Sequence, residues 1–422
     1  MTGMTVKKHL TDHKTSLILF IYIWIMYAIV YWTKNCFSGA MAAIVADGIM
    51  TKSQTGLITA LFYLVYAPLQ VVGGKLADRW RPDLLILIGL VGSAIANFII
   101  YLNQSYNLML VVWTLNSVVQ AALWPSIFKI ISSELAHEHR IRGVYYITFA
   151  STFGLCFAFI SAALMSKWQD NFLLSAILLV LMAIIMEIIY PIAARKMVPD
   201  ETGPAKALHD GFEHPEELDT RSFTMFKKCG LFILLPVIVM RGLLGLGIKN
   251  MAPTLLMESY DSVSPVVGNF LNIFIILSGL VGMFLVKRLY PKRIHDEIKG
   301  LGLFFVILIP IVALTLLVGK LPLSPIVVIL CLTIALTEGS GLFTQYYTVK
   351  FAKYGKNGEV AGYINMAAAF GIVIQSYGIA KIADVWGWIA ALAVLLALVV
   401  VSVVLIVIVI PKWKKFKTEY HM

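Results

Sequence analysis

Long apolar runs recur along the whole chain, and short polar segments separate them. Most runs hold about 18 or more largely apolar residues, which is enough for a helix to cross the hydrocarbon core of a bilayer. They are continuous and lack the polar–apolar alternation of a membrane β-barrel. We therefore predict an all-α integral membrane protein with twelve transmembrane helices, at residues 16–44, 54–77, 84–103, 106–133, 143–165, 171–194, 229–256, 264–287, 301–319, 324–349, 360–382 and 386–411.

One polar connection is much longer than the others. It follows the sixth predicted helix and contains Pro199, Gly203 and Pro204 among charges of both signs. This composition is typical of a linker, here with room for a short surface helix. We therefore predict a bundle of six helices at residues 1–194, a linker at 195–228 and a second six-helix bundle at 229–422.

Composition agrees with a membrane protein, because 59% of the 422 residues are hydrophobic and only 14% are charged. Soluble domains carry about 25% charged residues. The polar first residues and the length of the apolar run behind them argue against a cleavable signal peptide. The cysteines lack metal-ligand spacing and are expected to be buried small side chains, so no metal or other cofactor is predicted.

The net charge of +11 does not indicate a nucleic-acid partner, because basic residues gather in alternate short loops. Lys7, Lys8 and Lys14 precede the first predicted helix, whereas the other set of loops has few basic residues, such as Lys52. Cytoplasmic loops are enriched in lysine and arginine. We expect a multi-pass protein of the plasma membrane, a bacterial inner membrane, with both termini and the linker in the cytoplasm.

The two halves of the chain resemble each other at a nearly constant offset, which indicates an internal duplication. Duplicated membrane bundles are a transporter architecture, in which the substrate lies near the membrane midplane between the repeats. The matching features are Lys34-Asn35 with Lys249-Asn250, Arg79 and Pro82 with Arg288 and Pro291, and Gly143 and Gly154 with Gly362 and Gly371.

Ionisable residues inside the apolar segments are costly, about 2.5–3.5 kcal/mol each on insertion scales, and so indicate function. They are Lys34, Arg241, Lys249 and Glu338. The excess of positive charge favours an anionic ligand, which arginine can bind through two parallel hydrogen bonds. Each has a structural alternative: Lys34 paired or reaching outward, Arg241 capping carbonyls, Lys249 at the interface and Glu338 as a counter-ion. Glu338 could instead exchange protons and couple transport.

Aromatic and amide side chains would complete an anion site. Tyr27, Tyr31 and Lys34 follow an i, i+4, i+7 spacing, which aligns them on one helix face. Trp124 precedes Pro125 and could instead belong to a helix kink. The remaining candidates for substrate contact are Tyr63, Tyr66, Tyr145, Gln345, Tyr346 and Asn365.

The loop after the second predicted helix reads GGKLADRWRPD, at residues 73–83. Gly74, Leu76, Ala77, Asp78 and Arg79 resemble the signature of the major facilitator superfamily. This resemblance implies twelve helices in two pseudo-symmetric bundles. It also implies that Gly74, Asp78 and Arg79 form a gating latch at the cytoplasmic ends, with the aspartate facing a helix N-terminus.

Several further stretches resemble one branch of that superfamily, the organophosphate:phosphate antiporters and their organic-anion relatives. They are TKNCFSGAM, KSQTGLITALFYLVYAPLQVVGGKLADR, LNSVVQAALWPSIFKI and AGYINMAAAFGIVIQSYGIAKIADVWGW. The branch usually has an arginine just before the lysine of the first helix, and here that position is Thr33.

These features together predict a secondary active transporter of a small organic anion that works by alternating access. A phosphorylated or sulfonated sugar or glycerol derivative, exchanged for an inorganic anion, is our first expectation. The alternatives are a proton- or sodium-coupled symporter of a carboxylate such as a sugar acid, and a transporter-like anion sensor. We predict no enzyme, because no phosphate-binding glycine loop or nucleophile–base pair is present. The chain is expected to be a monomer.

Overall fold

The computed structural model describes residues 8–199, 222–290, 292–351 and 357–420, and within these ranges it is almost entirely helical. The chain divides into two compact units, which are described separately below. Unit 1 comprises Met1–Ala40 and Val65–Glu213, and unit 2 comprises Met41–Leu64 and His214–Met422. The segment 41–64, the tip of the hairpin made by the first two helices, therefore belongs to unit 2.

Unit 1 is built around the third and seventh helices, α3 and α7, which pack along each other, while α4 lies against α3. The elements of this part of the chain are β1 (Lys8–Leu10), α1 (His13–Ala46), α2 (Lys52–Arg79), α3 (Pro82–Leu102), α4 (Tyr106–Gln120), α5 (Leu123–Lys129), the π-helical turn η1 (Ile130–Glu134), α6 (His137–Leu164), α7 (Asp170–Arg195) and β2 (Met197–Pro199).

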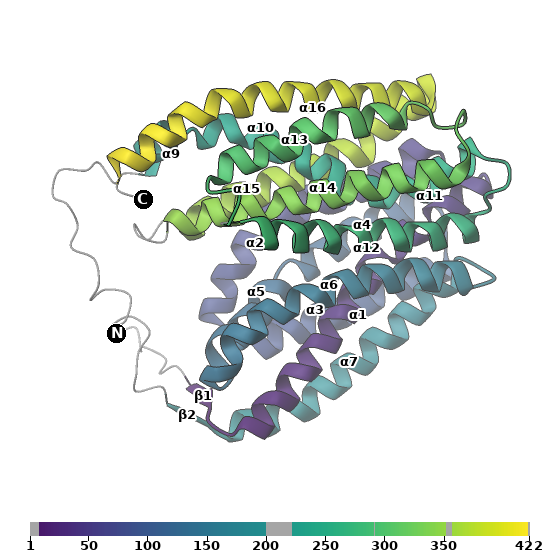
Figure 1. Ribbon diagram of the computed structural model, residues 1–422. Coiled ribbons are helices and arrows are strands. Elements are labelled where there is room, and N and C mark those ends of the chain that lie inside the picture. The colour runs from purple at the N-terminus through teal and green to yellow at the C-terminus, as the bar shows by residue number, and fades with distance from the viewer. Residues whose placement is uncertain (1–7, 200–221, 291, 352–356, 421–422) are drawn as a thin grey trace. The chain divides into compact units, whose positions relative to one another are not determined.

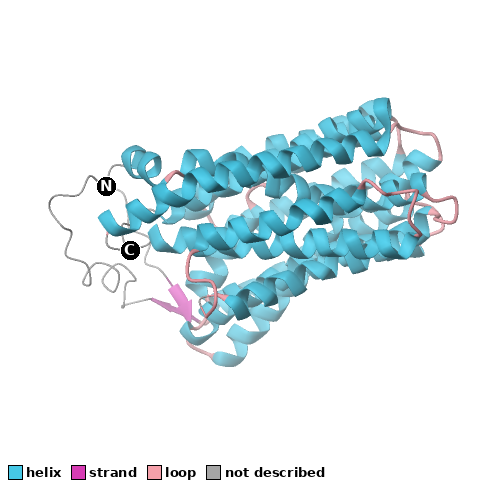
Figure 2. Cartoon of the chain, turned by 45° about the horizontal axis from the view of Figure 1, so that its top comes forward, coloured by secondary structure: helices cyan, strands magenta, loops and turns pink. Residues whose placement is uncertain are grey.

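A short two-stranded ribbon closes one end of unit 1 (Figure 2, magenta). Strand β1 pairs antiparallel with β2, so that Leu10 lies opposite Met197. The Leu10 side chain is fully buried. The sequence did not predict this ribbon, because three residues are too short for a visible alternation.

In unit 2, α14 packs against both α12 and α13, α16 lies along α13, and α10 lies along α15 (Figure 1). The elements are α9 (Ser222–Cys229), α10 (Leu231–Gly242), the π-helical turn η2 (Leu243–Gly247), α11 (Ile248–Ser259), α12 (Pro265–Leu289), α13 (Glu297–Thr315), α14 (Leu323–Lys350), α15 (Asn357–Val373), the π-helical turn η4 (Ile374–Ile379) and α16 (Ala380–Glu419). Helix α9 lies within the predicted linker, of which residues 200–221 fall outside the described residues.

The membrane-spanning pattern confirms the predicted fold class. Among the described residues, nine helices are long and apolar enough to cross a bilayer. The last of them, Gly362–Glu419, contains the eleventh and twelfth predicted spans, and Gly387 interrupts it with a positive φ of 81°. The second and fifth predicted spans form α2 and α6, and α6 has a shorter apolar part, Phe149–Leu164.

Apolar side chains also cover the outward faces of the helices. Ile95, Ile188, Val281 and Val407 are all more than half exposed in the structure. A soluble protein would leave such large apolar patches uncovered only at an interaction site. Here the hydrocarbon of a bilayer is the natural solvent for these faces.

One glycine match of the predicted duplication has a structural counterpart in both units. A Cβ at Gly154 would lie 2.2 Å from the carbonyl oxygen of Ala28, so α6 crosses α1 in close contact. A Cβ at Gly371 would lie 2.0 Å from the carbonyl oxygen of Val239, so α15 crosses α10 in the same way. The fifth and eleventh spans therefore pack on the first and seventh spans by equivalent glycines, as a duplicated unit requires.

The second glycine match does not extend to the packing. A Cβ at Gly143 would lie 2.9 Å from the Ile131 side chain, whereas a Cβ at Gly362 would meet no atom within 4 Å. The two units have therefore diverged at this position.

Candidate functional site

A group of aromatic rings surrounds Lys34 in unit 1. Helix α1 supplies Tyr27, Tyr31 and Lys34, while α2 supplies Tyr66 and α5 supplies Trp124. The Lys34 Nζ atom lies 3.6 Å from the ring centre of Tyr66 and 5.6 Å from that of Tyr31. The Tyr27 ring is 5.3 Å from Tyr31 and 5.0 Å from Trp124, measured between ring centres. The structure thus brings together five residues that the sequence singled out.

The ammonium group of Lys34 is held in a low-dielectric setting, because the residue is only 7% exposed. A cation over an aromatic face gains about 2 kcal/mol or more when both are desolvated. An apolar, aromatic lining with one convergent charge is typical of a small-molecule site. The geometry therefore suits an anion that carries an uncharged body.

Unit 2 holds a second charged group, formed by Arg241, Lys249 and Glu338. The Lys249 Nζ atom lies 2.5 Å from Glu338 Oε1, and Lys249 is only 8% exposed. Arg241 is close enough to Glu338 for their charges to interact. Glycines leave space for these side chains, because a Cβ at Gly279 would lie 2.9 Å from Glu338 Cγ and one at Gly341 2.6 Å from Arg241 Nη1.

A π-helical turn explains how both cations reach the same carboxylate. Arg241 and Lys249 are separated by η2, residues Leu243–Gly247. In a regular α-helix, eight residues rotate through about 2.2 turns, which leaves the two side chains about 80° apart. A π-turn closes i→i+5 hydrogen bonds and rotates less per residue. The turn therefore brings Arg241 and Lys249 more nearly onto one face.

The charges of this group do not cancel. Two cations face one carboxylate, and Glu338 is already engaged by Lys249. The Nε atom of Arg241 is buried and has no hydrogen-bond partner among the described residues. A buried donor without a partner costs about 1–3 kcal/mol, more when charged, and this cost is removed by an acceptor that binds there. The group can therefore receive an anionic ligand.

Sequence reasoning named Asn250 only as part of the repeat and did not name Gln375. Asn250 is 2% exposed, and neither its Oδ1 nor its Nδ2 atom has a hydrogen-bond partner among the described residues. Gln375, in η4, is also 2% exposed and its Oε1 atom likewise lacks a partner there. Buried amides in this state are candidates for ligand contact. The Lys-Asn pairing in both halves is the sequence signal that pointed to Asn250.

The other predicted site residues lie elsewhere or cannot be placed. Tyr346 stacks on Tyr290, with 4.4 Å between ring centres, and Gln345 and Asn365 are exposed. The side chains of Tyr145, Gly74, Asp78 and Arg79 lie outside the described part of the structure. Their roles in substrate contact and gating remain predictions.

The neighbourhood of the predicted gating loop can be described. The Lys129 Nζ atom donates a hydrogen bond of 2.5 Å to the carbonyl oxygen of Ala77, which ties the end of α2 to α5. Arg81 pairs with Asp83 at 2.5 Å. Beyond the span 106–129, in η1, the Tyr190 hydroxyl donates to Glu134 Oε2 at 3.0 Å. Burial raises the pKa of Glu134 to about 7, although the Tyr190 hydrogen bond and Lys129 oppose the rise.

This pKa predicts that stability falls as pH rises. Between about pH 4.5 and 7 the folded protein keeps a proton on Glu134 that the unfolded chain has lost. Unfolding then releases a proton, so raising the pH favours unfolding by up to about 1.4 kcal/mol per pH unit. We expect the thermal midpoint of the purified protein to drop between pH 5 and pH 8. Glu134→Gln, which stays neutral, should remove most of this drop; an equal drop in both proteins would contradict the assignment.

Candidate metal sites are not apparent in the described ranges, which hold no group of three or more His, Cys, Asp or Glu side chains with suitable placement.

The chain matches a protein-family model described as Major Facilitator Superfamily over residues 23–376. The membrane sensor protein UhpC of Escherichia coli is 22% identical to it over 389 residues, covering 87% of this chain and 85% of UhpC. A probable hexose phosphate transport protein of Chlamydia pneumoniae is 24% identical over 422 residues, covering 90% and 88% of the two chains.

Solved structures resemble the fold at lower identity. A bacterial homologue of the human lysosomal transporter Spinster, in an inward-facing and unoccupied conformation, matches with a TM-score of 0.74 at 14% identity, over 96% of this chain and 99% of its own. The nucleoside transporter NupG matches with a TM-score of 0.68 at 16% identity, over 95% of this chain and 99% of its own.

Proposed function

The chain belongs to the Major Facilitator Superfamily, a superfamily of transporters, and from this we propose that it is a secondary active transporter of a small organic anion working by alternating access. A phosphorylated sugar is the leading substrate class. This choice is supported by the relatives described as hexose phosphate transport proteins and by the stretches that resemble the organophosphate branch.

The observation that carries the proposal is the state of Arg241. Its Nε atom is buried without a partner among the described residues, while the nearby Glu338 is engaged by Lys249. A guanidinium group matches phosphate and carboxylate oxygens through two parallel hydrogen bonds. The substrate anion would supply those oxygens.

We assign roles to the site residues on this basis. Lys34 and Arg241 each bind the charged part of the substrate, and Lys249 adjusts the charge beside Arg241. Tyr27, Tyr31, Tyr66 and Trp124 contact the uncharged part. Tyr145, Gln345, Tyr346 and Asn365 are further proposed contacts, and Gly74, Asp78 and Arg79 form the gating latch.

The mode of coupling follows from the same group of charges. Exchange for an inorganic anion is our first proposal, and symport with a proton or sodium ion, with a carboxylate as substrate, is the alternative. Glu338 is the proposed coupling residue, because it is an acid in the apolar middle of a span and it contacts Lys249.

The protein is a multi-pass membrane protein of a bacterial transporter type by family and relatives. We propose that it lies in the inner membrane with both termini in the cytoplasm, in accord with the clusters of lysine and arginine in alternate loops. One chain supplies both units, which favours a monomer.

A second candidate function is anion sensing. The relatives described as membrane sensor proteins favour it, since they are similar over most of both chains. A sensor would bind the anion without moving it at a useful rate. Flux through liposomes that contain only this protein separates the two functions.

The proposed substrate class is tested by ligand binding and by flux. Purified protein should gain thermal stability with a hexose phosphate, more than with matched sulfonates or carboxylates, because bound ligand stabilises the folded state. Liposomes loaded with inorganic phosphate should take up labelled hexose phosphate. The stabilisation should disappear in Arg241→Ala.

Arg288→Ala is the matched control, because Arg288 is an exposed arginine in the last turn of α12. It should retain both binding and flux. A hexose phosphate that neither stabilises the protein nor crosses the liposome membrane would refute the assignment, and stabilisation without flux would favour a sensor.

A further inference from the structure

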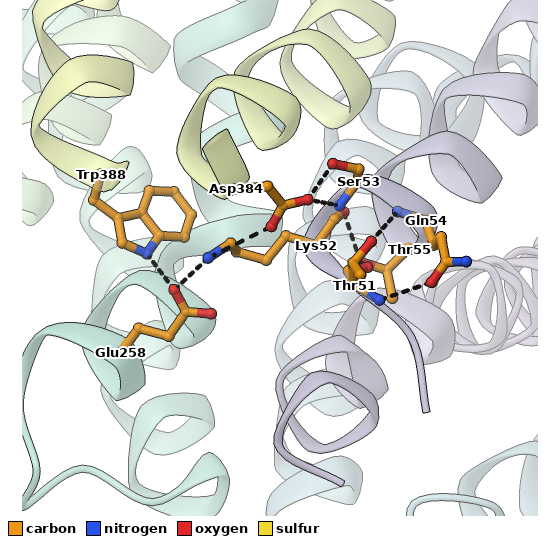
Figure 3. Close-up of polar contacts among 8 residues, drawn as sticks. All are labelled: Thr51, Lys52, Ser53, Gln54, Thr55, Glu258, Asp384 and Trp388. Atoms are coloured by element: carbon orange, nitrogen blue, oxygen red, sulfur yellow. Dashed lines mark hydrogen bonds and ion pairs between the residues drawn. The ribbon is translucent and has the colours of Figure 1, made fainter. Parts of the chain in front are cut away.

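The tip of the α1–α2 hairpin is fastened to unit 2 by a group of charges (Figure 3). Lys52, the first residue of α2, places its Nζ atom 2.6 Å from Glu258 Oε2 and 3.5 Å from Asp384 Oδ1. Glu258 lies near the end of α11 and Asp384 lies in α16. The Trp388 indole donates a further hydrogen bond of 2.8 Å to Glu258 Oε2. One lysine therefore connects the tip to two helices of unit 2.

Asp384 also binds the beginning of α2 directly. The backbone N–H of Ser53 donates to Asp384 Oδ2 at 2.7 Å, and the Ser53 hydroxyl donates to the same oxygen. A carboxylate at a helix N-terminus is favoured by the helix dipole and satisfies a free N–H group. Asp384, far away in sequence, thus acts on α2 as a capping residue would.

Close backbone packing accompanies these polar contacts. A Cβ at Gly56 would lie only 1.7 Å from the carbonyl oxygen of Ser376, in η4. The side chains of Thr55 and Ile58 on either side are also buried. Only a glycine allows α2 to come this near to η4, so the contact is specific to the observed arrangement.

The two helices that carry the tip continue without a break into unit 1. The boundary between the units falls after Ala40 in α1 and after Leu64 in α2. Pro68 lies inside α2, four residues beyond that boundary. A movement of unit 1 as one body must therefore either pull the tip off unit 2 or bend α1 and α2 near the boundary.

We propose that the hairpin tip, residues 41–64, is a releasable latch: its ion pairs through Lys52 to Glu258 and Asp384 hold the tip on unit 2 in one state of the transport cycle and break in the other. The inference rests on the proposed transport activity. It assigns Lys52, Glu258 and Asp384 to the control of the conformational equilibrium and gives them no contact with substrate.

The burial of these side chains suits a contact that must open. The side chains of Lys52, Glu258 and Asp384 are 16%, 26% and 19% exposed, so water reaches all of them. Partly hydrated ion pairs are weaker than dry ones and can be broken and remade. A switching element needs states that differ by only a small free energy, and such pairs provide it.

A reversible cross-link tests the latch. The Ser53 hydroxyl touches Asp384, so the double variant Ser53→Cys/Asp384→Cys should form a disulfide under mild oxidant. We expect uptake into liposomes to fall at least tenfold on oxidation and to recover on reduction. The single variants Ser53→Cys and Asp384→Cys, treated identically, should keep their uptake. Failure of the disulfide to form, or full uptake by the cross-linked protein, would overturn the proposal.

A labelling experiment tests the same latch without transport. Ser53→Cys alone is treated with a membrane-impermeant maleimide, with Lys52 present or replaced by glutamine. We expect Lys52→Gln to increase the labelling rate of the cysteine severalfold, because the tip is released more often. A nearby lysine favours the reactive thiolate, so its loss would by itself slow labelling. An unchanged or slower rate would therefore argue against the latch.

A glycine variant supplies a second, uncharged way to weaken the latch. Gly56→Ala should also increase the labelling rate of Ser53→Cys, whereas Gly362→Ala, whose Cβ would meet no atom within 4 Å, should not. Absence of flux in the reduced double variant and in the wild type would refute transport itself. The labelling rates would then still decide whether the tip is released.

Discussion

Replacing Lys34 by alanine should reduce uptake of the anionic substrate by on the order of 100-fold or more, while the protein still inserts and folds. Losing one partner of a desolvated charge pair costs about 2–5 kcal/mol in binding, and each 1.4 kcal/mol is about tenfold. The fold should survive because the alanine removes a charge that is only 7% exposed. A buried charge is a weak source of stability. Initial uptake rates in liposomes, normalised to reconstituted protein, measure the effect.

Two further variants make the Lys34 result specific. Lys34→Arg keeps the positive charge over Tyr66 and should retain part of the uptake, although the planar guanidinium fits the ring differently. Lys320→Ala removes an exposed lysine and should leave uptake unchanged. Uptake by Lys34→Ala at the wild-type rate would remove Lys34 and its aromatic neighbours from the binding site.

Glu338→Gln should separate the two modes of coupling. The amide cannot gain or lose a proton, and it leaves Lys249 without its anionic partner at 2.5 Å. If Glu338 carries the coupling proton, uptake driven by a pH gradient should fall at least tenfold while exchange between internal and external substrate continues. We expect this pattern. Parallel assays of gradient-driven uptake and of counterflow with the same liposomes measure it.

The control for Glu338 is Glu187→Gln, because Glu187 is an exposed acid in α7. It should alter neither assay. Equal rates for wild type and Glu338→Gln in the gradient-driven assay would show that Glu338 is a counter-ion for the two basic residues and nothing more.

The fold could be predicted largely from hydrophobic pattern, because each span must be apolar and long enough for the bilayer whatever its neighbours are. The same local rule placed Tyr27, Tyr31 and Lys34 on one face of α1, and the structure has them together. Duplication could also be read from local matches, and the close contacts of Gly154 and Gly371 agree with it.

Contacts between distant segments could not be predicted in this way. The sequence left the partner of Glu338 open between Arg241 and Lys34, and the structure gives Lys249, at 2.5 Å. Lys249 itself had seemed equally suited to the membrane interface. Lys52 stood out as a basic residue in a loop that had few, but nothing local connects it with Glu258 or Asp384. Such pairings depend on helix packing, which a single sequence does not specify.

The wide turn η2 contains one residue more than a regular helix would need between Arg241 and Lys249. Deleting one residue from 243–247 could therefore be absorbed as ordinary α-helix, with no break in the chain's hydrogen bonding. The deletion would still rotate everything before the turn against everything after it by about 100°, the angle per residue of an α-helix. Insertions and deletions at this point are thus a cheap evolutionary route to a new cargo preference, because they re-aim a charge without unfolding a span.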